Sequence, residues 1–265
     1  MTNQPENIIV EARDVSFSYP EEPDKYVLNS LNLQVSRGEC VAILGESGAG
    51  KTTLLKLLCG LLQPSQGQIL FEGKPLQGPR NDIALIFQNY GLFPWKTVRE
   101  NILLPVRLGK KRADENELGK LLDYLGLREF SHRFPAELSG GQLQRTALGR
   151  AVMSGASLLL MDEPFSALDL RNRTRLQSFM KTFLEDTGMT SVIVTHSVEE
   201  ALCMGDRVAV FDPERGRLRK IWEGCRQMAD SNTAELDERI RLIRESLLQV
   251  QEADCRFDER KIPNN

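Results

Sequence analysis

Short apolar runs separated by turn residues recur along most of the chain. Leu31, Leu33 and Val35 alternate with polar neighbours, and this alternation predicts a strand over residues 27–35 with one buried face. The run Cys40–Leu44 is apolar throughout, which is typical of a strand covered on both faces. Similar runs predict further strands at Ile8–Phe17, Ile69–Phe71, Ile83–Phe87, Leu158–Met161, Ser191–Val194 and Val208–Phe211.

Helical patterns alternate with the later strands, which predicts an α/β fold with a largely parallel sheet. The predicted helices are Thr52–Leu62, Glu115–Leu125, Gln142–Met153, Leu170–Thr187 and Val198–Met204. The first is too rich in leucine for a surface helix, so we expect it to be buried. Residues 88–150 have helical patterns and almost no strand signal, which indicates a helical insert within the α/β framework.

A further helix is predicted near the C-terminus, over residues 234–252. Apolar residues form one stripe on it, at Leu236, Ile240, Ile243, Leu247 and Val250. The stripe is shorter than the three or four heptads that a coiled coil requires. We therefore expect this helix to pack on its own domain, with a dimer or partner contact as the alternative.

Composition and charge narrow the class of protein. The chain has 34 Lys and Arg against 37 Asp and Glu, a net charge of −3, which argues against a protein that coats nucleic acid. No apolar run approaches the roughly 18 residues of a membrane span, and the polar segment Met1–Asn7 lacks the core of a secretory signal. The 5 cysteines form no CxxC pair, so we expect reduced thiols and no zinc site.

A glycine-rich loop follows the predicted strand Cys40–Leu44. Its sequence, Gly45-Glu-Ser-Gly-Ala-Gly-Lys51-Thr52, fits the pattern GxxxxGK[ST], and an apolar helix comes next. Glycines let the backbone approach an anion, and backbone N–H groups at the helix start then face phosphates. In such a loop the lysine reaches the β- and γ-phosphates and the Thr52 hydroxyl ligates Mg²⁺. An incidental lysine on a glycine-rich turn is the alternative, which the strand and helix on either side disfavour.

Two carboxylates, Asp162 and Glu163, end the apolar strand that begins at Leu158. The carboxyl end of a parallel strand is where α/β sheets bind ligands. Asp162 is a candidate for the Mg²⁺ shell, and Glu163 is a candidate to accept a proton from the attacking water. Solvated acids at a strand end are the alternative, and the glycine-rich loop makes that interpretation less favourable.

The segment Leu138-Ser-Gly-Gly-Gln142 precedes a predicted helix within the helical insert. Ser139 is thus placed near a helix N-terminus, which is a second geometry suited to an anion. A serine N-cap followed by spare glycines is the alternative for this pentapeptide when it is taken alone.

Together these motifs make the chain resemble an ATP-binding cassette (ABC) ATPase. The resemblance covers residues 8–212 and has six parts in order: Walker A at 45–53, the Q-loop Gln88, the signature 138–142, Walker B at 158–163, the D-loop 166–169 and the switch His196. It implies the P-loop NTPase fold of that family: a RecA-like α/β core, an antiparallel β subdomain and a helical subdomain. The implied division of the single domain 1–265 is 1–87 and 151–225 for the core, 88–150 for the helices, and 226–265 for the C-terminal extension.

The resemblance also implies roles for individual residues. ATP is held by Tyr19, which stacks on adenine, and by Gly45, Glu46, Ser47, Gly48, Ala49, Gly50, Lys51, Thr52, Thr53, Gln88 and Asp162. Ser139, Gly140, Gly141 and Gln142 face the ATP of a second subunit, so two ATP molecules join a dimer, which Asp169 contacts across the interface. Thr52, Gln88 and Asp162 hold Mg²⁺. Glu163 is the general base, and His196 contacts the γ-phosphate. For Tyr19 a half-buried strand tyrosine is the alternative.

The sequence after Gln88, LFPWKTV followed by Glu100-Asn101, most resembles ATPases of prokaryotic importers of the nitrate, sulfonate and taurine group. In that group the segment receives the membrane permease, so Gln88–Trp95 is the expected docking region. Trp95 within the core of the helical insert is the alternative. The resemblance further implies a periplasmic or extracellular solute-binding protein as an indirect partner, and a peripheral position on the cytoplasmic face of the membrane.

Two positions depart from the family pattern. Ser197 stands where aspartate commonly follows the switch histidine, and Gly149 stands where alanine is usual. A glycine inside a helix costs about 1 kcal/mol relative to alanine. Neither change removes a catalytic group, so both weaken the assignment to a subgroup more than the assignment of activity.

Other functions compete with import. The ATPase of an ABC exporter is the nearest alternative, and the Phe93–Trp95 segment favours import over it. A non-transport ABC ATPase of DNA repair or translation usually has two cassettes, long coiled coils or basic surfaces. A P-loop kinase or switch is disfavoured by the signature and by Glu163. We expect no nucleic-acid partner.

Overall fold

The computed structural model describes residues 7–109, 114–166, 168–224 and 238–245 of the chain. Its smaller sheet is antiparallel, with strand order β2-β1-β4-β5. These strands are β1 (Ile8–Phe17), β2 (Leu28–Ser36), β4 (Gln66–Phe71) and the short β5 (Lys74–Pro75). The alternating positions Leu31, Leu33 and Val35 are buried as predicted, with polar neighbours exposed.

The larger sheet has the order β10-β9-β3-β8-β7-β6. Its strands are β3 (Cys40–Leu44), β6 (Ile83–Ile86), β7 (Leu158–Asp162), β8 (Thr190–Thr195), β9 (Arg207–Asp212) and β10 (Arg217–Glu223). All neighbours are parallel except β9 and β10. Because β8 lies between β3 and β7, the carboxyl ends of these strands meet at one edge, where the glycine-rich loop, Glu163 and His196 follow.

The inner strands β3, β7 and β8 of the larger sheet are buried on both faces, which explains their apolar runs. Helix α1 (Lys51–Leu58) packs between the two sheets, and its leucines share a core cluster with Leu158 and Leu160 of β7. Leu159 and Met161 point to the opposite face, into a second cluster with the later helices that lie over residues 98–102, 115–124, 140–154 and 170–187. This arrangement confirms the α/β class, the parallel sheet and the buried first helix.

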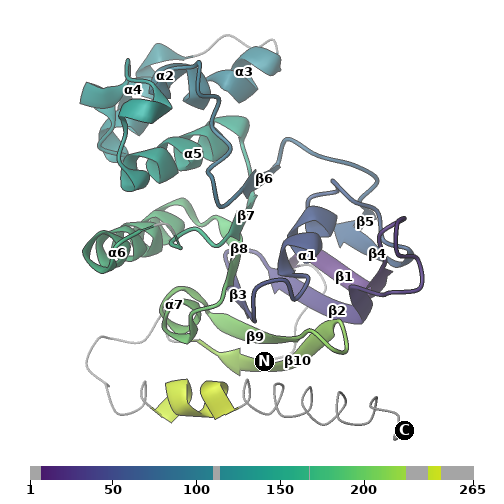
Figure 1. The fold of residues 1–265 in the computed structure, drawn as a ribbon. Coiled ribbons are helices and arrows are strands. Elements are labelled where there is room, and N and C mark those ends of the chain that lie inside the picture. Colours follow the sequence, from purple (N-terminus) through teal and green to yellow (C-terminus); the bar gives the residue numbers. More distant parts are fainter. Residues whose placement is uncertain (1–6, 110–113, 167, 225–237, 246–265) are drawn as a thin grey trace, which may run out of the picture.

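Only helices lie between β6 and β7 in the described part of that segment. They are α2 (Val98–Ile102), α3 (Leu104–Leu108), α4 (Glu115–Tyr124), two short 3₁₀ turns (Arg128–Phe130 and Pro135–Glu137) and α5 (Gly140–Ser154). Figure 1 shows these helices gathered at the end of the molecule opposite β1 and β2, with α6 (Leu170–Thr187) and α7 (Val198–Met204) closer to the larger sheet. None of the described helices is long and apolar enough to cross a bilayer.

The C-terminal helix is described only over residues 238–245. Its Ile243 is fully buried and belongs to a cluster with Ile240, Trp222 and residues of α7. Arg244 forms an ion pair with Glu199 of α7. The described part therefore packs on its own chain, whereas Leu236, Leu247 and Val250 lie outside the described residues.

Several element boundaries differ from the prediction. Helix α1 ends at Leu58 and not at Leu62, because Gly60 turns the chain with φ 76° where a Cβ would lie 2.4 Å from the carbonyl oxygen of Gly78. Helices α2 and α3 and strands β5 and β10 were not predicted from the sequence pattern. Strand β10 is mostly exposed and rich in charge, so its stability comes from backbone pairing with β9 more than from an apolar face.

Candidate nucleotide-binding site

The glycine-rich loop joins the end of β3 to the start of α1. Gly48 and Gly50 have φ 80° and 102°, a conformation that side chains with a Cβ rarely adopt. At Gly50 an added Cβ would also lie 2.8 Å from a methyl group of Val27. The loop backbone therefore depends on these glycines, and it wraps the start of a helix as phosphate-binding loops do.

Lys51 extends back over this loop from the first turn of α1. Its ammonium group donates to the carbonyl oxygen of Gly45 at 2.7 Å and to that of Glu46. Burial lowers the pKa of Lys51, while the carboxylates of Glu163, Asp162 and Glu46 oppose that shift. Phosphate oxygens are stronger acceptors than neutral carbonyls, so the position of Lys51 suits an anionic ligand.

Thr52 and Asp162 bring two oxygen ligands together. The Thr52 hydroxyl donates to a carboxylate oxygen of Asp162 at 2.8 Å, although the two residues are far apart in the sequence. Burial raises the pKa of Asp162, as does the charge of Glu163, whereas the Thr52 hydrogen bond lowers it. A hydroxyl beside a carboxylate is a donor set that Mg²⁺ accepts in proteins, so these residues fit the predicted metal.

Glu163 and His196 follow neighbouring strands and meet at the sheet edge. The Glu163 N–H donates to the carbonyl oxygen of Val194 at 2.9 Å, which fixes its backbone against β8. Glu163 has φ 46°, a strained conformation for a residue with a side chain. This turn aims its carboxylate at the His196 ring, with 3.3 Å between Oε2 and Nδ1.

Ser166 connects the Q-loop with the end of β7. Gln88 donates its amide to the Ser166 hydroxyl at 3.1 Å, and that hydroxyl donates to the carbonyl oxygen of Glu163 at 2.9 Å. The sequence motif places Ser166 in the D-loop but gives no sign of this bridge. Asp169, expected at a dimer contact, caps α6 here by accepting a hydrogen bond from the Asn172 N–H at 3.1 Å.

One cavity of about 410 Å³ brings most of these residues together. Its lining includes Tyr19, Val27, Ser47, Gly48, Gly50, Lys51, Thr52, Thr53, Gln88, Asp162 and Glu163. Tyr19 lies just beyond β1, half-buried, with its hydroxyl 2.9 Å from that of Thr53. Ala49, in contrast, is buried in the core, so it contributes only its backbone to the loop. The volume is typical of sites for small ligands.

The signature residues Ser139–Gln142 do not line this cavity. Ser139 caps α5, since its hydroxyl accepts from the Gln142 N–H at 3.4 Å and the Gln142 side chain accepts from the Ser139 N–H at 2.8 Å. The space around Gly141 is open, while Gly140 is so close to Leu168 that an added Cβ would lie 2.6 Å from its methyl group. The structure therefore places these residues apart from the phosphate loop of the same chain.

The loop after Gln88 presents Trp95 to solvent, with 68% of its surface exposed and its ring 5.4 Å from that of Phe93. Trp95 therefore does not fill the core, whereas Leu92 packs against the core of the helical region. The fully buried Asn101 holds this loop by accepting from the Phe93 N–H and donating to three carbonyl oxygens, those of Phe93, Lys96 and Thr97. The capping-box spacing of Thr97 and Glu100 was the signal in the sequence that could have located α2 and its Asn101.

The glycine loop, the oxygen pair and the carboxylate at the sheet edge define a P-loop nucleotide site. A family model described as ABC transporter matches residues 28–166. The taurine import ATP-binding protein TauB of Jannaschia sp. (strain CCS1) is 39% identical over 206 residues, which are 77% of each chain. The nitrate import ATP-binding protein NrtC of Synechococcus elongatus is 41% identical over 74% of this chain and 30% of its own length.

Solved structures give the same result. A dimeric ATP-binding cassette in a post-hydrolysis state, bound to ADP and Pi, is similar with a TM-score of 0.70 and 29% identity, over 81% of this chain and 98% of that one. The chain belongs to the ABC transporter family, as an ATP-binding domain with ATPase activity, and has the P-loop ABC-ATPase fold. The resemblance inferred from the sequence and the predicted fold class are thus confirmed.

Proposed function

We propose that this chain is the ATP-hydrolysing subunit of a membrane importer for a small solute. The observation that carries the proposal is the single cavity that Lys51, Thr52, Asp162 and Glu163 line together. Lys51 and Thr52 begin α1, Asp162 ends β7 and Glu163 directly follows it, and each has the chemistry that one part of Mg²⁺-ATP requires.

In this proposal the ATP phosphates lie on the backbone of residues 45–50, and Lys51 exchanges its carbonyl partners for phosphate oxygens. Tyr19 stacks on the adenine. Thr52, Asp162 and Gln88 would hold Mg²⁺, which supplies positive charge for the β- and γ-phosphate oxygens when it is bound. Thr52 and Asp162 support this role through their existing contact of 2.8 Å.

Glu163 accepts a proton from water as the water oxygen bonds to the γ-phosphorus and the bond to the bridging oxygen of ADP breaks. His196 contacts the γ-phosphate and stands beside the Glu163 carboxylate. The strained backbone of Glu163, fixed through its N–H, supports a base that is held in one orientation.

Two copies of the chain enclose two ATP molecules in this proposal. The support is that Ser139 and Gly141 do not line the phosphate cavity of their own chain, although their helix start suits an anion. The relative in the post-hydrolysis state is itself dimeric. Because the interface is symmetric, each signature segment would face the γ-phosphate bound by the other copy.

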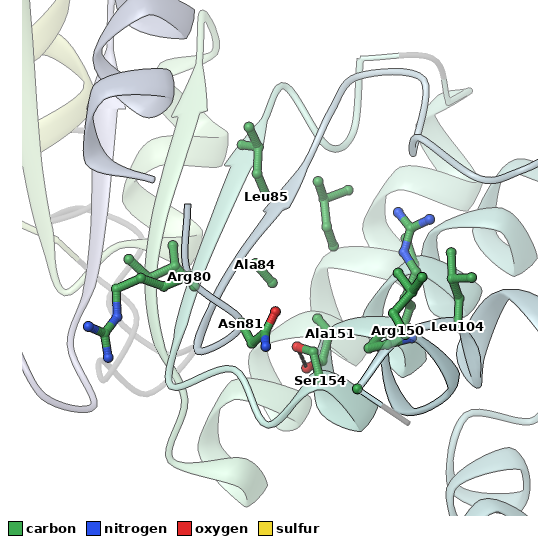
Figure 2. A pocket seen from close by; sticks show the side chains of 14 residues that line it. Arg80, Asn81, Ala84, Leu85, Leu104, Arg150, Ala151 and Ser154 are labelled. Atoms are coloured by element: carbon green, nitrogen blue, oxygen red, sulfur yellow. Dashed lines mark hydrogen bonds between the residues drawn. The ribbon is translucent and has the colours of Figure 1, made fainter. Parts of the chain in front are cut away.

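A second cavity, of about 320 Å³, suits a segment of the membrane permease. Figure 2 shows Arg80, Ala84 and Leu85 on one side of it, with Leu104 and Arg150 on the other. Leu108 also lines the cavity and is 74% exposed, so it offers apolar surface to a partner.

Arg150 connects this cavity with the Q-loop. Its guanidinium donates to the carbonyl oxygens of Gly91 at 2.7 Å and Tyr90 at 3.2 Å. Tyr90 lies two residues after Gln88, and Gly91 lies three residues after it. A permease segment bound in this cavity would therefore be connected through Arg150 and the Q-loop with the nucleotide site. The permease would then contact both this cavity and the exposed Trp95.

The solute belongs, in our proposal, to the class that includes taurine, other sulfonates and nitrate, since import proteins for taurine and nitrate are among the relatives. Substrate contacts then lie in the permease and in a periplasmic or extracellular binding protein. The chain would act as a peripheral subunit on the cytoplasmic face of the membrane.

The proposal is tested by deleting the gene in its native cell and measuring uptake of radiolabelled taurine and of nitrate. We expect uptake of one of them to be lost, restored by the wild-type chain and not by Lys51→Ala. A tagged wild-type chain should also purify with an integral membrane protein. Purification without a membrane partner would favour a non-transport ABC ATPase, and a neighbouring permease gene without a binding-protein gene would favour an exporter.

A further inference from the structure

Glu200 is a buried carboxylate that neither the phosphate cavity nor the sequence motifs explain. It belongs to α7, four residues after His196, and only 6% of its surface is exposed. A buried carboxylate requires charged or polar partners, because desolvation is costly. Its partners come from two segments that flank the candidate active site.

The first partner segment is the end of β8, directly before His196. The Thr195 hydroxyl donates to Glu200 at 2.6 Å, and the same hydroxyl accepts from the Ser197 N–H at 3.1 Å. Thr195 also accepts, through its carbonyl oxygen, from the N–H of Gly45 at 3.3 Å. Glu200 thus holds Thr195, the last residue of a strand that touches the phosphate loop, and reaches Ser197 on the other side of His196 through the Thr195 hydroxyl.

The second partner is Arg173 of α6, whose Nε lies 3.5 Å from Glu200. The other end of that guanidinium donates to the carbonyl oxygen of Leu168 at 3.2 Å. Leu168 belongs to the D-loop, and its side chain lies against Gly140 of the signature segment. Arg173 therefore ties Glu200 to a loop that contacts the start of α5.

We infer that Glu200 and Arg173 are a positioning pair, which makes the placement of His196 depend on the D-loop and on the signature segment beside it. The inference rests on the proposed ATPase cycle, in which His196 meets the γ-phosphate and the signature segment meets the second ATP. A pair between them couples closure of the signature segment to the geometry of hydrolysis. Neither residue touches the nucleotide in this account, so ATP affinity does not depend on the pair.

The test measures ATP turnover and affinity of the full-length chain, at protein concentrations where the wild type dimerises. The variants are Glu200→Gln, which keeps an acceptor for Thr195, Arg173→Gln and the double variant. We expect kcat to fall about tenfold in each single variant, since small displacements at a reacting site have effects of this order or larger. We expect the KM for ATP and the Kd of a fluorescent ATP analogue to stay within about twofold.

The double variant distinguishes a working pair from two independent residues. If the pair acts as a unit, the double variant loses no more kcat than either single variant, because the interaction is removed only once. Multiplying losses, or a kcat of Glu200→Gln within about twofold of wild type, would overturn the inference.

Glu39 and Arg207 provide a matched control pair. Their ion pair spans 2.9 Å, is comparably buried, and its arginine also donates to a backbone carbonyl, that of Gln34. Glu39→Gln and Arg207→Gln should lower the melting temperature and leave kcat unchanged, which separates a general loss of stability from a specific effect. A wild-type chain without ATP turnover would overturn the proposed function, and this inference with it, whereas normal wild-type turnover with unchanged pair variants would overturn the pair alone.

Discussion

The phosphate loop and the signature segment are both glycine-rich starts of helices, yet they differ in what surrounds them. Ser47, Gly48, Gly50, Lys51 and Thr52 of this loop line a cavity together with Asp162, which is hydrogen-bonded to Thr52, and with the candidate base Glu163, which directly follows β7. Residues 139–142 satisfy their own polar groups through a capping box, and none of them lines that cavity. The same local geometry can therefore form a complete binding site or only half of one, depending on what the sheet brings beside it.

The difference follows from topology. The phosphate loop follows β3, and the parallel neighbours β8 and β7 deliver His196 and Glu163 to the same edge. The signature segment follows a 3₁₀ turn within the helical region, where no strand ends beside it among the described residues. If the signature segment binds phosphate, the lysine, the metal ligands and the base of that site must come from another molecule. This is the basis of the proposed dimer.

The largest expected effect concerns the phosphate cavity. Glu163→Gln should keep ATP binding but reduce turnover by about 10²–10³-fold, because the amide cannot accept the proton from water. Turnover is measured by phosphate release at saturating Mg²⁺-ATP. A variant that hydrolyses ATP at nearly the wild-type rate would remove Glu163 as the base.

Lys51→Ala should weaken ATP binding by about 100-fold, since it removes charge-assisted hydrogen bonds to the phosphates. The measurement is titration with a fluorescent ATP analogue. Lys74→Ala, which removes an exposed lysine of β5, is the control and should bind as the wild type does. Equal affinity of the two variants would contradict the phosphate-site interpretation.

Ser139→Arg changes only the signature segment and leaves the phosphate cavity of the same chain intact. A bulky cation at the cap of α5 should leave ATP binding by the monomer unchanged and reduce ATP-dependent dimerisation at least tenfold, because it occupies the space meant for the second phosphate. Sedimentation velocity reports the dimer fraction. Ser178→Arg, on the exposed surface of α6, should dimerise normally. Normal dimerisation of Ser139→Arg would place the signature segment outside the interface.

Trp95→Ala tests the surface that adjoins both regions. It should spare nucleotide binding but weaken assembly with the permease about tenfold, as expected for an exposed aromatic anchor. Co-purification from membranes measures the effect, and Tyr26→Ala, which removes another exposed aromatic, is the control. Assembly at the wild-type level would exclude Trp95 from the docking surface.

The smallest expected effect is on the stability of the signature helix. Gly149→Ala gains helix propensity, but its methyl group would lie 2.8 Å from Leu125 and 3.0 Å from Ile102, both buried. Overpacking costs about 1–3 kcal/mol, so we expect a net loss of about 1 kcal/mol in urea unfolding. Gly119→Ala in α4 meets only the guanidinium of Arg128, at 3.2 Å, and should be stabilising. A stabilised Gly149→Ala would mean that α2 and α5 adapt easily.

Much of this could be predicted from the sequence, because the relevant signals are local. The apolar run of β3, the glycines after it and the two acids at the end of β7 and directly after it each lie within a few neighbouring residues. Gly149 is different. From the sequence alone it is a residue that destabilises a helix, but in the structure its lack of a side chain allows close packing against Leu125 and Ile102. The contacts of Asn101 and Ser166 could not be predicted either: the capping box could have located Asn101 on a helix, but the loops that both residues hold are brought to them by other elements.

Size-exclusion chromatography of the Glu163→Gln protein, with and without ATP, tests most directly the claim that the signature segment of one copy meets the ATP bound in the phosphate cavity of the other. The account predicts a monomer that becomes a dimer only when ATP is present, and a loss of that shift when Ser139→Arg is added. A Glu163→Gln protein that binds ATP and stays monomeric at every concentration, or a shift that Ser139→Arg leaves intact, would contradict it.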